Sequence, residues 1–204
     1  MPRKYELKQR AEQQAATRLR IVEAAVALHE AIGGGATTIA AIAERAGVGR
    51  LTVYRHFPDE LALLSACTGH YLSCNPPPDP ASWMEIDDPT ARLRAALTAA
   101  YAYYRRTQGM LARAEQDAPT NPILAELMEP FTAFWRQVRD GLATGWRRAD
   151  EPAAFTVVAI GHALAFSTWR SLTQEHALAD DQAVALMLAF VDAAVRFDAS
   201  STTG

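Results

Sequence analysis

The chain has 204 residues, of which 50% are hydrophobic and 21% charged, a composition typical of a folded protein rather than a disordered one. No apolar stretch approaches the roughly 20 residues that a membrane-spanning helix needs. No apolar segment of a secretory signal peptide follows the charged start of the chain. We therefore expect a cytoplasmic protein that does not enter a membrane.

The net charge of −3 is unevenly distributed along the chain. Residues 1–56 carry nine Lys or Arg and five Asp or Glu, whereas the remainder carries 11 and 18. A basic N-terminal part on an acidic body is typical of a DNA-binding protein with a second function, although a charged run alone is more often a solvated face.

The hydrophobic pattern predicts an all-α protein, because apolar residues recur at intervals of three and four and no stretch alternates as a strand does. We expect about nine helices, with a frayed tail from residue 199. They are predicted at residues 17–32, 39–46, 49–56, 59–74, 89–107, 109–117, 121–146, 152–174 and 180–197. The glycines at 33–35 and Gly47 end the first two helices, and Asp59 caps the fourth.

Residues 38–57, TIAAIAERAGVGRLTVYRHF, have the pattern of a helix-turn-helix. Five apolar residues are expected to hold its two helices together: Ile39, Ile42, Ala43, Val48 and Val53. The side chains left to project from the second helix are Arg50, Leu51, Thr52, Tyr54, Arg55 and His56. A rigid pair can place that helix in the major groove of DNA, where Arg50 can bind guanine or phosphate and Thr52 can contact a base.

Four short motifs in this region are Arg18-x-x-Ile21-Val22-x-Ala24-Ala25, Thr37-Thr38-Ile39, Ile42-Ala43-x-Arg45-Ala46-Gly47-Val48 and Thr52-Val53-Tyr54-Arg55-His56-Phe57. As a set they resemble the signature of the tetracycline-repressor (TetR) family. A less specific likeness follows at residues 166–172 and 181–184. The resemblance implies a DNA-binding domain at residues 1–58, in which the matching positions contact DNA: Thr38, Arg50, Thr52, Tyr54 and His56.

Two departures from the family pattern concern DNA binding. Pro58-Asp59-Glu60 stands where many members have a lysine that contacts phosphate, and Leu51 replaces a residue that is often small. The acidic pair puts the phosphate contact in doubt. The basic arm with Arg3, Lys4, Lys8 and Arg10 can add phosphate or minor-groove contacts, or it can be a solvated tail.

For residues 59–204 the resemblance implies a cavity for a small molecule and a homodimer formed by the last two helices. Aromatic walls with a few polar groups suit an organic, largely apolar effector, although aromatic residues at helical spacing are more often ordinary core. The candidates for the pocket are Tyr101, Tyr104, Met110, Arg113, Phe134, Trp135 and His162. The candidates for the dimer interface are Phe166, Trp169, Leu186 and Phe190.

Cys67, His70 and Cys74 share one predicted helix at intervals of three and four. The two sulfur atoms lie about two turns apart, so one metal ion could take His70 with one cysteine but hardly all three ligands. We therefore predict no metal site and regard both cysteines as small thiols.

No phosphate-binding glycine loop, two-histidine metal motif or nucleophile elbow occurs in the sequence, so we predict no catalytic residue and no cofactor. The predicted function is a repressor that a small molecule releases from a palindromic, double-stranded operator. Two alternatives remain: an activator or ligand-blind regulator of the same fold, and an all-α enzyme or carrier in which the helix-turn-helix only packs.

Overall fold

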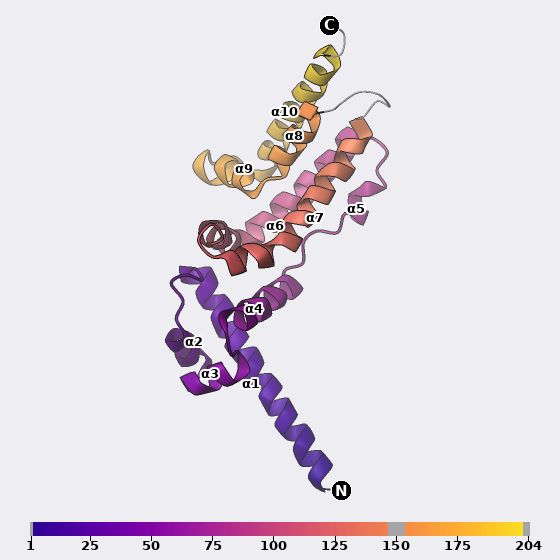
Figure 1. Cartoon of the computed structure of the whole chain (residues 1–204). Coiled ribbons are helices and arrows are strands. Elements are labelled where there is room, and N and C mark those ends of the chain that lie inside the picture. The colour runs from indigo at the N-terminus through magenta and orange to yellow at the C-terminus, as the bar shows by residue number, and fades with distance from the viewer. Residues whose placement is uncertain (1, 147–153, 202–204) are drawn as a thin grey trace. The chain divides into compact units, whose positions relative to one another are not determined.

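The computed structural model describes residues 2–146 and 154–201, with side chains from residue 6 onward (Figure 1). The described residues form ten α-helices and no strand, which confirms the all-α prediction. The helices are α1 Pro2–Ile32, α2 Ile39–Ala46, α3 Arg50–His56, α4 Glu60–Cys74, α5 Ala81–Met84, α6 Pro89–Asp117, α7 Pro122–Ala143, α8 Ala154–Leu164, α9 Phe166–Arg170 and α10 Asp180–Ser201. A 3₁₀ turn, Thr144–Trp146, and a π turn, Ser171–Glu175, complete the described helical structure.

The chain divides into two compact units, and neither is a continuous segment. Unit 1 contains Met1–Pro76 and Gly109–Met128, and unit 2 contains Pro77–Gln108 and Glu129–Gly204. Helices α6 and α7 therefore each contribute to both units. The domain boundary predicted at residue 58 separates the DNA-binding residues from those expected to bind the effector and form the dimer. It stays a prediction. None of the described helices is long and apolar enough to cross a membrane.

The core of unit 1 is built from the apolar faces of α1 to α4. Its fully buried members include Ile21 on α1, Ile42 on α2 and Val53 on α3. Phe57, directly after α3, is also buried in this core. The two short helices of the helix-turn-helix are therefore fixed by packing against α1, as amphipathic helices of this length require.

Between residues 2 and 117 the structure departs from the predicted helices at three places. Helix α1 begins at Pro2 rather than near residue 17, so the predicted basic arm is helical. Helix α6 is continuous where two helices were expected. A Cβ atom at Gly109 would lie 3.2 Å from Cγ of Glu30, so this glycine permits a close approach to α1 rather than a break. The four-residue helix α5 was not predicted.

The helix predicted over residues 152–174 is interrupted at Ala165, and its expected first two residues lie outside the described part of the chain. Ala165 has extended backbone angles, φ −70° and ψ 136°. The carbonyl groups freed at the end of α8 accept buried hydroxyl groups from α6: Tyr101 Oη donates to Ala163 O at 2.9 Å and Tyr104 Oη to Leu164 O at 2.6 Å. These bonds satisfy backbone groups that would otherwise be unpaired in the core.

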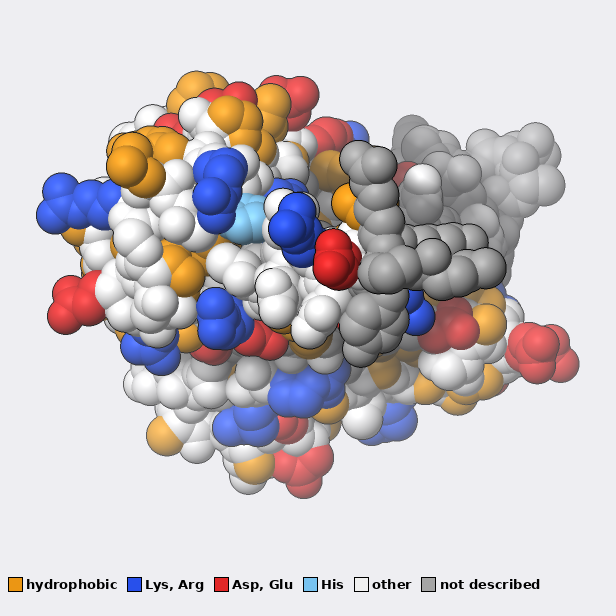
Figure 2. Space-filling model, turned by 90° about the horizontal axis from the view of Figure 1, so that it is seen from below, with side chains coloured by type: hydrophobic (Ala, Val, Ile, Leu, Met, Phe, Trp, Pro, Cys, Tyr) orange, Lys and Arg blue, Asp and Glu red, His pale blue; other side chains and the backbone are white. Residues whose placement is uncertain are grey.

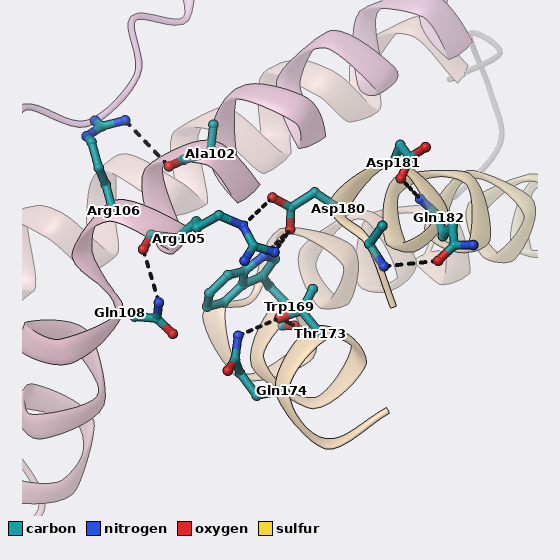
Figure 3. Close-up of polar contacts among 11 residues, drawn as sticks. Ala102, Arg105, Arg106, Gln108, Trp169, Thr173, Gln174, Asp180, Asp181 and Gln182 are labelled. Carbon is teal, nitrogen blue, oxygen red and sulfur yellow. Dashed lines mark hydrogen bonds and ion pairs between the residues drawn. The ribbon is translucent and has the colours of Figure 1, made fainter. Parts of the chain in front are cut away.

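A polar clamp in unit 2 joins α6, α9 and the start of α10 (Figure 3). The Arg105 guanidinium donates to both carboxylate oxygens of Asp180 at 2.6 Å. Trp169, whose side chain is buried, donates its Nε1–H to Asp180 Oδ1 at 3.0 Å. Asp180 thus satisfies a buried indole and an arginine at the same time. These hydrogen bonds, that from Arg105 above all, hold the pKa of Asp180 below its ordinary value of 3.8.

Replacing Asp180 tests which of its two partners matters more. Asp180→Ala leaves the buried Trp169 Nε1–H without an acceptor and should lower the free energy of unfolding by about 1–3 kcal/mol. Asp180→Asn keeps an acceptor oxygen and should cost less, because the partly exposed ion pair contributes only about 1 kcal/mol or less. Denaturant titration at pH 7 measures both values. Equal losses of stability in the two variants would contradict the larger role given to the acceptor for Trp169.

The same clamp predicts a pH dependence. The pKa of Asp180 is lower in the folded state than its ordinary value of 3.8, which applies to the unfolded chain. The ionised carboxylate therefore contributes fully to the free energy of unfolding above pH 3.8, and this contribution is lost as the pH falls through the pKa of the folded state. The stability difference between the wild type and Asp180→Asn should therefore shrink below about pH 4.

Candidate DNA-binding interface

Helix α2 and the turn that follows it are fixed by residues at the two ends of the helix. Thr38 caps the helix, and its Oγ1 accepts the N–H of Ala41 at 3.2 Å. Gly47 ends it in the left-handed conformation, with φ 64° and ψ 39°, and Val48 N donates back to Ala43 O at 2.9 Å. A glycine is favoured here because other side chains are strained at positive φ. The predicted end of this helix at Gly47 is confirmed.

Helix α3 presents its polar side chains outward because Val53 occupies the inner face. At 100° per residue, Leu51 and Arg55 lie opposite Val53, with Arg50 and Tyr54 on one flank and Thr52 and His56 on the other. The exposures agree: Leu51 is 85% and Tyr54 51% exposed, Arg50, Arg55 and Thr38 are exposed, and Thr52 and His56 are half-buried. The predicted DNA-binding side chains of α3 therefore lie on its solvent-accessible side, and Thr38 is accessible at the start of α2.

Arg50 and Arg55 lie at opposite ends of α3 and so interact differently with the helix dipole. Arg55 and His56 lie in the last turn, where positive charge complements the helix dipole. Arg50 lies in the first turn, where a cation opposes the dipole and no acidic residue compensates it. The position of Arg50 is not explained by helix stability.

Arg18 is a contact residue whose role was not predicted from the sequence. Its Nη1 donates to His56 O at 2.7 Å, and its guanidinium lies 4.1 Å from the centre of the Phe57 ring. This side chain on α1 therefore holds the C-terminal end of α3, where backbone carbonyls lack helical partners. Arg18 is part of the first motif that resembles the TetR family, so the sequence marked the residue but not its contact with α3.

Basic side chains lie on either side of a histidine on the face of unit 1 seen from below, with hydrophobic side chains among them (Figure 2). The pKa of His56 is lowered by burial, then by the neighbouring charges of Arg55 and Arg18. This lowered pKa favours the neutral imidazole, which can donate one hydrogen bond to a phosphate oxygen without adding charge.

The acidic residues at the start of α4 have partners within unit 1. Asp59 caps the helix, with Oδ1 accepting the N–H of Ala62 at 2.8 Å. Glu60 Oε1 accepts from Asn121 Nδ2 at 2.8 Å. Where the family pattern has a lysine, the chain therefore has two carboxylates that accept hydrogen bonds within unit 1.

The N-terminal half of α1 is an exposed helix rather than an extended arm. Lys8 forms an exposed i,i+4 pair with Glu12 at 3.9 Å, and Arg10 is exposed. The side chains of Arg3 and Lys4 lie outside the described part of the structure. Contacts of this helix with DNA stay a prediction.

The seven candidates for a ligand pocket differ in their surroundings. Tyr101, Tyr104, Phe134 and Trp135 belong to one aromatic cluster in unit 2, where the Tyr104 and Trp135 rings lie 5.4 Å apart and the Phe134 and Trp135 rings 5.1 Å apart. Met110 and Arg113 lie in unit 1, and Arg113 Nη2 donates to Ala31 O at 3.2 Å. His162 is exposed on α8.

The four candidates for a dimer interface separate into two pairs. Leu186 and Phe190 are 47% and 43% exposed on α10. Trp169 is fully buried and Phe166 is 8% exposed, and the two rings stack on each other at 5.6 Å. Within the single chain, Phe166 and Trp169 are thus largely enclosed, and an interface role for the four residues stays a prediction.

Cys67 and Cys74 differ in environment. Cys67 is buried, and burial raises the pKa of its thiol to about 12. Cys74 is exposed, with Sγ 3.8 Å from Nε2 of His70. Across the described residues no group of three or more His, Cys, Asp or Glu side chains is arranged to hold a metal ion.

Comparison with known proteins agrees with this geometry. Residues 21–67 match the model of the bacterial regulatory proteins of the tetR family. No curated protein sequence matches the chain. Among solved structures, a TetR transcription regulator from Haloarcula marismortui ATCC 43049 superposes with a TM-score of 0.59 at 15% identity, over 89% of this chain and 97% of the other. GusR of Salmonella enterica gives 0.58 at 15%, over 89% and 96%.

The structural neighbours establish the fold, and the family match covers the helices whose surface is described above. Proteins of this family are DNA-binding transcription regulators rather than enzymes. Residues 21–67 thus carry the sequence pattern of the tetR family of bacterial regulatory proteins, and the chain has the fold of the TetR regulators that it superposes on.

Proposed function

We propose that the protein is a cytoplasmic repressor that binds a palindromic operator as a homodimer and is released from it by a small organic molecule. The observation that carries the DNA-binding part is the outward surface of α3. It groups Arg50, Tyr54 and Arg55 around Leu51 while Val53 fixes the helix in the core. A helix that served only for packing would not require this cluster.

A homodimer is supported by an exposed apolar surface on α8 and α10, the α8–α10 face. It consists of Phe155, Val158, His162, Leu186, Phe190 and Phe197. The two helices pack together, with the Phe155 and Phe197 rings 4.8 Å apart and the His162 and Phe190 rings 5.7 Å apart. Exposed apolar surface of this kind marks an interaction site. To bind a palindromic operator, the homodimer would have to present its two copies of α3 to half-sites about 34 Å apart.

The effector site is proposed at the aromatic cluster of unit 2, around Tyr104, Phe134 and Trp135. Tyr101 and Tyr104 use their hydroxyl groups on the carbonyls of α8, so the ligand would contact their rings rather than their polar ends. Helix α6 carries this cluster and also Asp117, whose Oδ2 accepts the N–H of Gly34 at 2.7 Å at the end of α1. A shift of α6 would therefore reach the helix that supports α3.

The test is binding of the wild-type protein to fluorescent double-stranded fragments of the DNA upstream of its own coding region. We expect one fragment to bind at least about 10³-fold more tightly than a shuffled sequence, with affinity falling linearly on a log–log plot against salt. Apolar compounds that raise Tm should then weaken operator binding, because a ligand that favours one conformer must lower affinity for DNA that favours the other.

Two results would contradict separate parts of this proposal. Absence of specific binding to any fragment would remove the DNA-binding role. Compounds that raise Tm without changing operator affinity would leave a ligand-blind regulator. In vitro transcription from the bound fragment distinguishes repression from activation.

A further inference from the structure

Leu51 is the most exposed of the large hydrophobic side chains among the described residues, at 85%. It is the second residue of α3 and lies opposite the buried Val53 on the helix. It belongs neither to the buried core of unit 1 nor to the partly buried residues packed against that core. Folding of unit 1 therefore does not account for a leucine at this position.

The surroundings of Leu51 indicate what kind of partner it meets. Its neighbours on the surface of α3 are Arg50 and Thr52 beside it in sequence and Tyr54 and Arg55 one turn along, and each of them carries a charge or a hydroxyl group. A protein-docking patch would be expected to be contiguously apolar. A single apolar side chain among arginines instead fits a polyanionic groove with an isolated apolar group.

The major groove of DNA offers one such group, the C5 methyl of thymine, since the other base edges present hydrogen-bond donors and acceptors there. Residues in the first turn of a recognition helix approach the base edges most closely. We propose that Leu51 contacts a thymine methyl in each operator half-site and so specifies a T·A pair at that position. This inference rests on the proposed DNA-binding function.

The experiment removes the methyl group from the DNA and the leucine from the protein. The operator is identified by selection from random double-stranded DNA, and each thymine is then replaced by deoxyuridine, which keeps the base pair and loses only the methyl. Affinities of the wild type, Leu51→Ala and Ile32→Ala are measured by fluorescence anisotropy. Ile32, 46% exposed at the end of α1, is the matched control for loss of an exposed aliphatic side chain outside α3.

We expect one deoxyuridine position in each half-site to weaken wild-type binding by about fourfold, the value of one buried methyl group. Leu51→Ala should bind the thymine and deoxyuridine operators equally, whereas Ile32→Ala should keep the fourfold preference. This cycle isolates the pairwise contact from any general loss of affinity. Helical circular dichroism and retained non-specific binding confirm that Leu51→Ala is folded.

Two results overturn the proposal and can be told apart. If the operator binds specifically but no thymine is sensitive, or Leu51→Ala keeps the sensitivity, the methyl contact is wrong while the regulator stands. If selection yields no specific DNA, both the contact and the proposed function fall.

Discussion

Replacing Phe190 by glutamate is expected to convert the protein to monomers and to weaken operator binding by about 10²–10⁴-fold. Phe190 lies in the α8–α10 face and is 43% exposed in the single chain. Two-fold symmetry would bury two glutamates in an apolar interface, where an unpaired carboxylate costs several kcal/mol. The loss in DNA affinity follows because the second half-site would no longer be bound intramolecularly.

The measurement combines sedimentation equilibrium with titration of full and half operators. Half-site affinity should be unchanged in Phe190→Glu, which separates loss of dimerisation from misfolding. Ala185→Glu is the matched control, since it adds the same charge to another exposed flank of α10. A Phe190→Glu protein that still sediments as a dimer, or a wild type that sediments as a monomer, would place the interface elsewhere.

The second large effect concerns Arg50. Arg50→Ala is expected to reduce affinity for the operator by roughly 30-fold to 10⁴-fold, because a bidentate arginine–guanine contact contributes about 1–3 kcal/mol and occurs once in each of two half-sites. Arg50 opposes the dipole of its own helix, so its removal should not lower the stability of α3. Tm should therefore stay the same or rise while specific binding is lost.

The salt dependence distinguishes base contact from phosphate contact. If Arg50 binds guanine, specificity relaxes at one base pair; if it binds phosphate, affinity falls for all sequences and the salt slope decreases by about one per half-site. Arg20→Ala removes the same charge from an exposed position on α1 and serves as the control. Equal losses on specific and shuffled DNA for both variants would show that Arg50 contributes only net charge.

The parts of the fold that were predicted correctly depend on local chemistry. Thr38 and Gly47 mark the two ends of α2 because capping and positive φ are properties of a few adjacent residues. The outward surface of α3 follows from the position of Val53 and helical periodicity alone. These local signals were sufficient to predict the candidate DNA-binding surface.

The errors arose where distant segments decide the outcome. The break at Ala165 depends on hydroxyl groups more than 60 residues earlier, and the continuity of α6 at Gly109 depends on its approach to Glu30. The acceptor for the buried indole N–H of Trp169 is Asp180, 11 residues later in the chain. Similarly, the role of Arg18 depends on a carbonyl group 38 residues away. Periodicity records that a side chain is apolar or basic, but not which neighbour it meets.

The discontinuous composition of unit 1 has a consequence for the order in which the protein is made. Its two pieces meet through Asp117, which accepts from Gly34 and Gly35, and through Asn121, which donates to Glu60. A nascent chain that has emerged only to residue 76 lacks both contacts, although its helix-turn-helix is already complete. Unit 1, which carries the helix-turn-helix, can therefore complete its packing only after the ribosome has also synthesised residues 77–108 of unit 2 and residues 109–128.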